Sequence, residues 1–423
     1  MKKYIISIIL GLSAGVSAFT QPWSLEECVA YALEHNPEVA RLEIASRQSR
    51  SRLAGECLDM LPTFSANIGD NLSALSVSGE MVLFQGFTKH FQRQSAKLVY
   101  DMSVLETLGI KEDLAIRVIE SYLQLAQAFQ QLDYARAGYE ASLQERDKTS
   151  LLVTGGSQPM SALMQVEAQL ASDRSSMVEA ECAVKSRRLE LCQAMDLPYD
   201  SGMSIRKDEM SDSLMPPPLC TAEDIRAAVE RNPKYRRSET AIRQREAAFA
   251  GSIGSLSPTL SLRAEYCTPV RQTAPLNTSY AGLNISMPVF GNWRRIAQIA
   301  EARHAVRQAR MEAYATRREL ESALERAVIE SSNSYSKSAA ALENVKALKE
   351  SLRINRLKYE QGLITVTDYT LAKSEYDKAL SAFLKARWQY VFQLKVIDYY
   401  MSDYCYGQNG EDRSRSHRPV GGK

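Results

Sequence analysis

The chain has 423 residues, of which 45% are hydrophobic, and its 52 lysines and arginines nearly balance its 50 aspartates and glutamates. That length allows two or three ordinary domains with buried cores. The charge balance gives no reason to expect a nucleic-acid or acidic-polymer partner. The seven cysteines are scattered and lack the spacing of a zinc site, so we interpret them as isolated thiols.

The first 18 residues have the composition of a secretory signal peptide. A basic "MKK" precedes the apolar "YIISIILGLSAGV", and Val16-Ser17-Ala18 has the small residues of a cleavage site. We expect the mature chain to begin near Phe19. Beyond that point no stretch approaches the roughly 18 apolar residues that a membrane-spanning helix needs. The sequence therefore predicts an exported protein that is periplasmic, secreted or a strand-built outer-membrane protein.

One phrase is written twice in the chain. "ALEHNPEV" occupies residues 32–39 and "AVERNPKY" occupies residues 228–235, so Asn36-Pro37 and Asn232-Pro233 lie 196 positions apart. A proline disfavours helical geometry in the residue before it. We expect each phrase to mark a bend in the first helix of a repeated unit.

The elements that follow the phrase repeat as well. "TFSANIG" follows Pro62 and "TLSLRAEY" follows Pro258, again 196 positions apart, and both alternate apolar and polar residues as strands do. Second strands are expected in "SVSGEMVLF" and "YAGLNISMPVF". The sequence predicts one hairpin at about 63–84 and another at about 259–290.

A helical pattern replaces the strand pattern after each hairpin. Residues 87–154 contain two glycines and no proline, and residues 292–360 contain neither. Apolar residues recur there three and four positions apart, which predicts helices about 100 Å long. Helices of that length have no globular core to lie on, so we expect coiled-coil packing.

Both long helices are predicted to end at a glycine. Gly155-Gly156-Ser157 closes the first and Gln361-Gly362-Leu363 closes the second, with 206 positions between Gly156 and Gly362. Helical patterns resume over about 160–196 and 366–402. Residues typical of helix starts follow each break: Ser157, Pro159, Thr367 and Asp368.

The fold predicted from these patterns is mainly α with a small β part, built as a tandem duplication of a helix-strand-strand-helix-helix unit. We divide the chain into a signal peptide at 1–18, a first repeat at 19–198, a linker at 199–220, a second repeat at 221–402, and a polar, disordered tail at 403–423.

This order of elements resembles the TolC-type outer-membrane efflux protein family. The resemblance is carried by the doubled "NP" phrases, the two proline-led hairpins, the junctions "LFQGFTKH" and "VFGNWRRI", and above all "LKYEQGLITVTDYTLAKSEYDKAL" at 357–380. It extends from Trp23 to Met401 and implies a homotrimer, with a shared 12-stranded membrane β-barrel and long helices that form an α-barrel. Four strands alone would leave unpaired edges in lipid, which independently favours closure by further copies.

Four aromatic residues lie at the strand-to-helix junctions: Phe84, Phe87, Phe290 and Trp293. They are candidates for an aromatic girdle at the membrane interface, with ordinary packing where the barrel narrows as the alternative. Basic residues follow directly, and for these a solvated face is a simpler interpretation than contact with lipid head groups or a position on the duct wall: Lys89, Arg93, Arg294 and Arg295.

The resemblance also implies that the turns between paired helices close the channel and receive a periplasmic adaptor. The matching tip residues are Gly155, Gly156, Gly362 and Leu363. Asp368 matches an acidic gate residue, and threefold symmetry would bring three carboxylates together; the alternative is that Asp368 supports a helix start. Leu371 stands where the family often has a second acid, so cation selectivity stays open.

The sequence offers no catalytic constellation, phosphate loop or metal cluster, and predicts neither an enzyme nor a cofactor. Carboxylates three and four residues from lysine or arginine are interpreted as solvated pairs. The predicted function is a passive exit duct of the outer membrane, opened when an adaptor docks and served by an inner-membrane RND or ABC transporter. The alternative is a periplasmic coiled-coil adaptor or scaffold without a pore.

Overall fold

The computed structural model describes residues 22–68, 74–206, 216–217, 220–269, 278–287 and 293–401. The predicted signal peptide, the polar tail after Met401, Phe290 and much of the predicted linker lie outside these residues.

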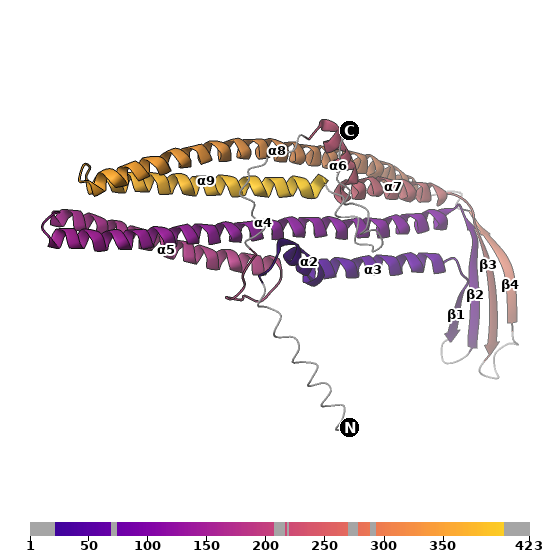
Figure 1. Ribbon diagram of the computed structural model, residues 1–423. Coiled ribbons are helices and arrows are strands. Elements are labelled where there is room, and N and C mark those ends of the chain that lie inside the picture. Colours follow the sequence, from indigo (N-terminus) through magenta and orange to yellow (C-terminus); the bar gives the residue numbers. More distant parts are fainter. Residues whose placement is uncertain are drawn as a thin grey trace, which may run out of the picture. The chain divides into compact units, whose positions relative to one another are not determined.

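Helices and strands follow the predicted order. In chain order they are α2 (Leu25–His35), α3 (Pro37–Leu58), β1 (Thr63–Ile68), β2 (Ala74–Gln85), α4 (Thr88–Thr154), α5 (Met160–Ala194), α6 (Ala222–Arg231), α7 (Pro233–Gly254), β3 (Thr259–Pro269), β4 (Thr278–Ser286), α8 (Trp293–Glu360) and α9 (Val366–Met401) (Figure 1). The two long helices, α4 and α8, have 67 and 68 residues.

The doubled Asn-Pro phrase separates two helices, so the predicted bend within one helix was wrong. Asn36 is extended and ends α2, after which Pro37 begins α3. Asn232 is the N-cap of α7, where its side chain accepts a 2.9 Å hydrogen bond from the backbone N–H of Lys234. Proline tolerates the first position of a helix because its missing N–H has no partner there, which explains a break directly before it.

The four strands form one antiparallel sheet in the order β1-β2-β3-β4. The two predicted hairpins are therefore joined edge to edge through β2 and β3 (Figure 1). Within the described residues, β1 pairs only with β2 and β4 pairs only with β3, which leaves one open edge on each side of the sheet.

Contacts divide the chain into two units, and both long helices contribute to each. Unit 1 contains residues 1–37, 111–225 and 323–423, and unit 2 contains residues 38–110 and 226–322. Unit 2 holds the sheet with α3, α7 and the first parts of α4 and α8. Unit 1 holds the remainder of α4 and α8 with α2, α5 and α9.

The core of unit 1 surrounds α4 on more than one side. Leu114, Ala115, Val118 and Ile119 are all buried, although neighbours in a helix point in different directions. The hydroxyl of Tyr122 donates toward the carbonyls of the segments before α2 and after α5. Within the described residues, no helix is long and apolar enough to cross a membrane.

Candidate functional site

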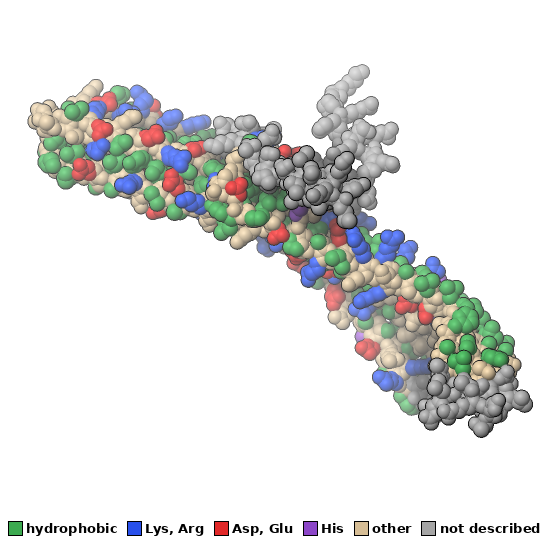
Figure 2. Space-filling model, turned by 90° about the horizontal axis from the view of Figure 1, so that it is seen from below, with side chains coloured by type: hydrophobic (Ala, Val, Ile, Leu, Met, Phe, Trp, Pro, Cys, Tyr) green, Lys and Arg blue, Asp and Glu red, His purple; other side chains and the backbone are tan. Residues whose placement is uncertain are grey.

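One face of the sheet is apolar and exposed. Side chains directly opposite one another on paired strands share a face, and the register brings these together: Phe64, Ala66, Leu75, Val77, Met81, Leu260, Leu262, Ala264, Tyr266, Ala281, Leu283 and Ile285. Phe64, Leu283 and Ile285 are 78%, 63% and 71% exposed. Hydrophobic side chains gather over the strands in Figure 2.

The opposite face of the sheet is mostly polar. It carries Thr63, Ser65, Asn67, Ser76, Ser78, Glu80, Ser261, Arg263, Glu265, Thr278, Tyr280 and Asn284. Arg263 and Glu265 form an ion pair at 3.2 Å on this face. A sheet that is apolar on one exposed face and polar on the other has the pattern of a barrel strand between lipid and water.

The junctions between strands and helices expose aromatic side chains. Phe84 and Phe87 stack edge to face with ring centroids 5.5 Å apart, yet Phe87 is 67% exposed and Trp293 is 73% exposed. Packing accounts for the contact between the two phenylalanines, but the described residues leave most of the Phe87 and Trp293 side chains uncovered.

Two of the four basic junction residues bind the ends of the preceding helices. Lys89 Nζ donates to the backbone carbonyl of Asp59 at 2.6 Å and lies 2.8 Å from its carboxylate. Arg295 donates to the carbonyl of Ser255 at 2.6 Å. Both carbonyls lie just beyond a helix C-terminus, where positive charge is favourable. Lys89 and Arg295 therefore bind helix ends in addition to facing solvent, a role that the interpretation as a solvated face did not include.

A glycine pair permits a close backbone approach beside these junctions. Gly86 has φ +54°, and a Cβ on it would lie 2.2 Å from the carbonyl oxygen of Gly254. A Cβ on Gly254 would lie 2.2 Å from the carbonyl oxygen of Gly86. No side chain fits at either position, so this crossing of the β2–α4 and α7–β3 junctions requires glycine.

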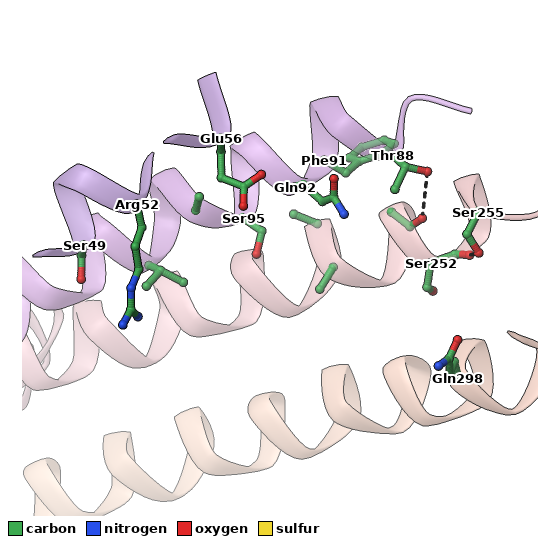
Figure 3. Close-up of a pocket in the computed structure, with 15 residues that line it drawn as sticks. Ser49, Arg52, Glu56, Thr88, Phe91, Gln92, Ser95, Ser252, Ser255 and Gln298 are labelled. Carbon is green, nitrogen blue, oxygen red and sulfur yellow. Dashed lines mark hydrogen bonds between the residues drawn. The ribbon is translucent and has the colours of Figure 1, made fainter. Parts of the chain in front are cut away.

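Helices α3, α4, α7 and α8 line a hollow of about 550 Å³ in unit 2 (Figure 3). Small residues of α4 and α7 form part of it, while Ser49, Arg52 and Glu56 come from α3 and Gln298 from α8. Contacts join the end of α3 to α4, α4 to α7 and α7 to α8. This order matches the sheet, because α3 precedes β1, α4 follows β2, α7 precedes β3 and α8 follows β4. The hollow is therefore lined by both polar and apolar side chains of four helices that contact one another in this order.

Both helical tips adopt the same backbone turn. Gly156 has φ +72° and Gly362 has φ +73°. In each turn the next residue's N–H bonds to a carbonyl five residues back, Ser157 to Leu152 and Leu363 to Lys358, both at 2.8 Å. This is the glycine-terminated helix end of a Schellman motif. Leu363 is 69% exposed, so the second tip offers an apolar side chain to solvent.

The helix starts after the tips differ from the prediction. The N-cap of α5 is Pro159 and makes no side-chain hydrogen bond, so Ser157 does not cap this helix. Helix α9 begins at Val366, and the hydroxyl of Thr365 accepts the backbone N–H of Asp368 at 3.2 Å. Thr365, rather than Thr367, is therefore the capping residue.

Asp368 completes the capping box of α9. Its carboxylate accepts the Thr365 backbone N–H at 3.2 Å and the Thr365 hydroxyl at 2.7 Å. The same arrangement joins Thr221 and Asp224 at the start of α6. A single chain thus bears out the helix-start role of Asp368, while a gate role depends on further copies.

The two helical hairpins of unit 1 pack together near their tips. Tyr359 and Tyr369 stack with ring centroids 5.2 Å apart, and the Tyr359 hydroxyl lies 3.5 Å from that of Thr149. Ala162 and Val166 of α5 complete this cluster. Burial raises the pKa of the Tyr369 phenol, because the charged form loses hydration.

A buried ion pair links α9 to the first hairpin, and sequence spacing did not reveal it. Lys373 Nζ lies 2.7 Å from a carboxylate oxygen of Asp173 and 2.5 Å from the hydroxyl of Ser142, and the Lys373 and Asp173 side chains are 11% and 13% exposed. Asp377 stands four residues beyond Lys373, which suggests a solvated pair in the sequence. The Lys373 ammonium instead bonds Asp173, which lies 200 residues away, whereas exposed pairs at three and four spacings occur elsewhere, as between Glu350 and Arg353.

Comparison with known proteins gives the family context of this geometry. Residues 225–395 match the sequence pattern of the family described as outer membrane efflux protein. The chain also has the fold of outer-membrane channels of known structure. The resemblance to the TolC-type family that the sequence predicted is therefore confirmed. No curated protein matches this chain by sequence.

Solved structures of outer-membrane channels share the fold of this chain. The CmeC outer membrane channel of Campylobacter jejuni has a TM-score of 0.76 at 14% identity, covering 89% of this chain and 85% of that one. The MtrE channel of Neisseria gonorrhoeae, in its open state, has a TM-score of 0.74 at 18% identity, covering 89% and 88%. CusC has a TM-score of 0.76 at 15% identity, covering 90% and 93%.

Proposed function

We propose that this chain is one subunit of an outer-membrane efflux channel, a passive exit duct that extends into the periplasm. The observation that carries the proposal is the sheet with one exposed apolar face and one polar face. Exposed apolar area on that scale is unfavourable in water and favourable against lipid. Strands β2 and β3 have 12 and 11 residues, against the roughly 9–11 needed to cross a bilayer when tilted.

The channel is a homotrimer in this proposal. The open edges of β1 and β4 carry backbone N–H and C=O groups that lipid cannot satisfy, so they pair with further copies of the sheet. Three copies of a four-stranded sheet make a 12-stranded barrel. The hollow lined by α3, α4, α7 and α8 then becomes part of the wall of a water-filled duct.

The remaining roles follow from this placement. Phe84, Phe87, Phe290 and Trp293 lie at the membrane interface, while Gly155, Gly156, Gly362 and Leu363 form the tips that contact a periplasmic adaptor. The fold supplies no energy source of its own, so an inner-membrane transporter of the RND or ABC type drives export. The system is a tripartite efflux or type I secretion machine.

Two measurements on purified protein test the channel function. Native mass spectrometry in detergent is expected to give a three-chain species, and planar-bilayer recording is expected to give stepwise conductance. A monomer without conductance would instead support the periplasmic scaffold and refute the channel.

Substituting Asp368 tests the gate. Asp368→Asn keeps an acceptor for the Thr365 donors but removes the charge, so we expect weaker block of the channel by divalent cations. Asp224→Asn is the matched control, because it alters the equivalent capping box at α6. Equal cation block in the wild type and both variants would leave Asp368 with its capping role alone.

A further inference from the structure

The two halves of the chain share contacts at fixed sequence offsets. Lys89 bonds the carbonyl of Asp59 at 2.6 Å, and Arg295 bonds the carbonyl of Ser255 at 2.6 Å. The helix-end residues differ by 196 positions and the basic residues by 206. Two offsets apply because the second half has ten more residues between its strands.

The strands obey the same two offsets. The hydroxyl of Thr63 donates to the carbonyl of Glu80 at 3.2 Å, and that of Thr259 donates to the carbonyl of Ser286 at 3.2 Å. Thr63 and Thr259 differ by 196, and Glu80 and Ser286 differ by 206. Residues of α3 and β1 therefore have counterparts 196 positions later in α7 and β3, and residues of β2 and α4 have counterparts 206 positions later in β4 and α8.

Within unit 2, the halves meet where α4 of the first packs against α7 of the second. Three of the contacts there are used below: Gln244 donates to Ser95 at 3.0 Å, Arg237 pairs with Glu106 at 3.5 Å, and a Cβ on Gly251 would lie 3.4 Å from the Cβ of Phe91. The sheet continues the same interface through the pairing of β2 with β3.

The counterparts of these residues lie on two open helix faces. By the 196-residue offset, Arg237, Gln244 and Gly251 of α7 correspond to Arg41, Gln48 and Gly55 of α3. By the 206-residue offset, Glu106, Ser95 and Phe91 of α4 correspond to Glu312, Glu301 and Ala297 of α8. All six are exposed in the single chain. Gly55 has no atom within 4 Å of where its Cβ would lie, whereas its counterpart Gly251 is packed.

The chemistry needed for contact is kept on both faces. Arginine, glutamine and glycine stand unchanged on α3, and Glu312 repeats the acid of Glu106. Glu301 replaces Ser95 and still offers an acceptor to a glutamine N–H, while Ala297 is smaller than Phe91. Ile44 lies on the same α3 face, three residues from Arg41, and is 55% exposed.

We propose that this α3 face docks on the α8 face of a second copy of the chain, with Gly55 against Ala297, Gln48 beside Glu301 and Arg41 beside Glu312. The inference rests on the proposed trimeric channel and specifies its subunit interface. The contact uses different surfaces on the two copies, and head-to-tail contacts of this kind close into rings.

A pair of cysteines tests the register. Disulfides need Cβ atoms about 3.5–4.5 Å apart, and the intrachain counterpart of the Gly55–Ala297 pair offers 3.4 Å. Oxidised Gly55→Cys/Ala297→Cys protein in native membranes is expected to run as a covalent three-chain species that a reductant returns to monomer. Phe91→Cys/Gly251→Cys is the positive control, because it should form the equivalent bond within one chain.

Matched variants separate the outcomes. Each single variant should cross-link no more than the wild type, which controls for the native thiols, and Gly55→Cys/Glu312→Cys should not link, because its partners lie turns apart. Co-expressed single variants should give two-chain species only.

Trimers without the disulfide would overturn the register and leave the channel function standing, and dimers from Gly55→Cys alone would overturn the head-to-tail contact. Absence of any trimer would overturn both proposals.

A charge exchange gives a second, independent readout. Arg41→Glu should place two acids together at the interface and reduce the trimer fraction in detergent, and adding Glu312→Arg should restore it. A trimer fraction that is unchanged by Arg41→Glu, or that is not restored by the second substitution, would contradict this pairing.

Discussion

Substituting Lys373 by alanine is expected to loosen α9 from the first helical hairpin. The Lys373 ammonium lies 2.7 Å from Asp173, in a site where both side chains are almost 90% removed from solvent. Deleting the cation leaves the Asp173 carboxylate largely buried without its ionic partner, although Gln169 still donates to it. Removal of one member of a buried pair costs about 3–5 kcal/mol, mostly because the remaining charge is desolvated.

Hydrogen exchange of the α9 amides measures this loss directly. Because each 1.4 kcal/mol is about a factor of ten in an equilibrium constant, exchange near Lys373 should accelerate by about 10²–10⁴-fold. Replacing both partners, as Lys373→Met/Asp173→Leu, should restore slow exchange, since well-packed apolar residues often substitute for a buried pair without loss of stability.

Arg353→Ala is the matched control for that experiment. Arg353 pairs with Glu350 at 2.8 Å on α8, but the two side chains are 61% and 57% exposed, so no resolvable change in exchange is expected. If Lys373→Ala behaved like this control, or if the double variant exchanged as fast as the single one, the assignment of the pair as a buried structural link would be refuted.

Two further predictions follow from single residues. Burial raises the pKa of Asp377, although Lys373 opposes this shift. The stabilisation that protonated Asp377 contributes is therefore complete below the ordinary pKa of 3.8 and is lost as pH rises through the higher folded pKa. Asp377→Asn should remove this pH dependence from thermal unfolding curves. Gly86→Ala should abolish folded trimer in membrane fractions, because its Cβ would lie 2.2 Å from the Gly254 carbonyl oxygen, whereas Gly138→Ala meets nothing within 4 Å and should not.

The sequence predicted the elements of this fold well because each is specified locally. Alternation identified the strands, and the absence of proline together with a three-four apolar spacing identified α4 and α8. The glycines at 156 and 362 marked the helix ends because both adopt a positive φ that other residues rarely tolerate. Six of the cysteines are free thiols, as interpreted: Cys28, Cys57, Cys182, Cys192, Cys220 and Cys267.

Contacts between distant segments could not be predicted in the same way. Asp377 lies four residues from Lys373, a spacing that suggests a pair between the two. The Lys373 side chain instead bonds Asp173. Lys89 and Arg295 looked like surface charge because the helix ends that they bind lie about 30 and 40 residues earlier. In each case the missing information was which helix faces meet, and local spacing does not contain it.

The repeats differ at a buried ion pair in unit 1. In unit 2 the basic junction contacts and the strand registers occur twice, with equal distances. By the 206-residue offset, Lys373 corresponds to the exposed Glu167 and Asp173 to Ala379, so the buried ion pair occurs once. The duplicated architecture does not require this pair, since the counterparts Glu167 and Ala379 cannot form one.

The helix starts beside the tips show the same difference. Thr365 and Asp368 cap α9 through hydrogen bonds, whereas the corresponding Pro159 and Ala162 leave α5 without a side-chain cap. Side-chain capping therefore stabilises the start of α9 and not that of α5, although both helices follow equivalent turns.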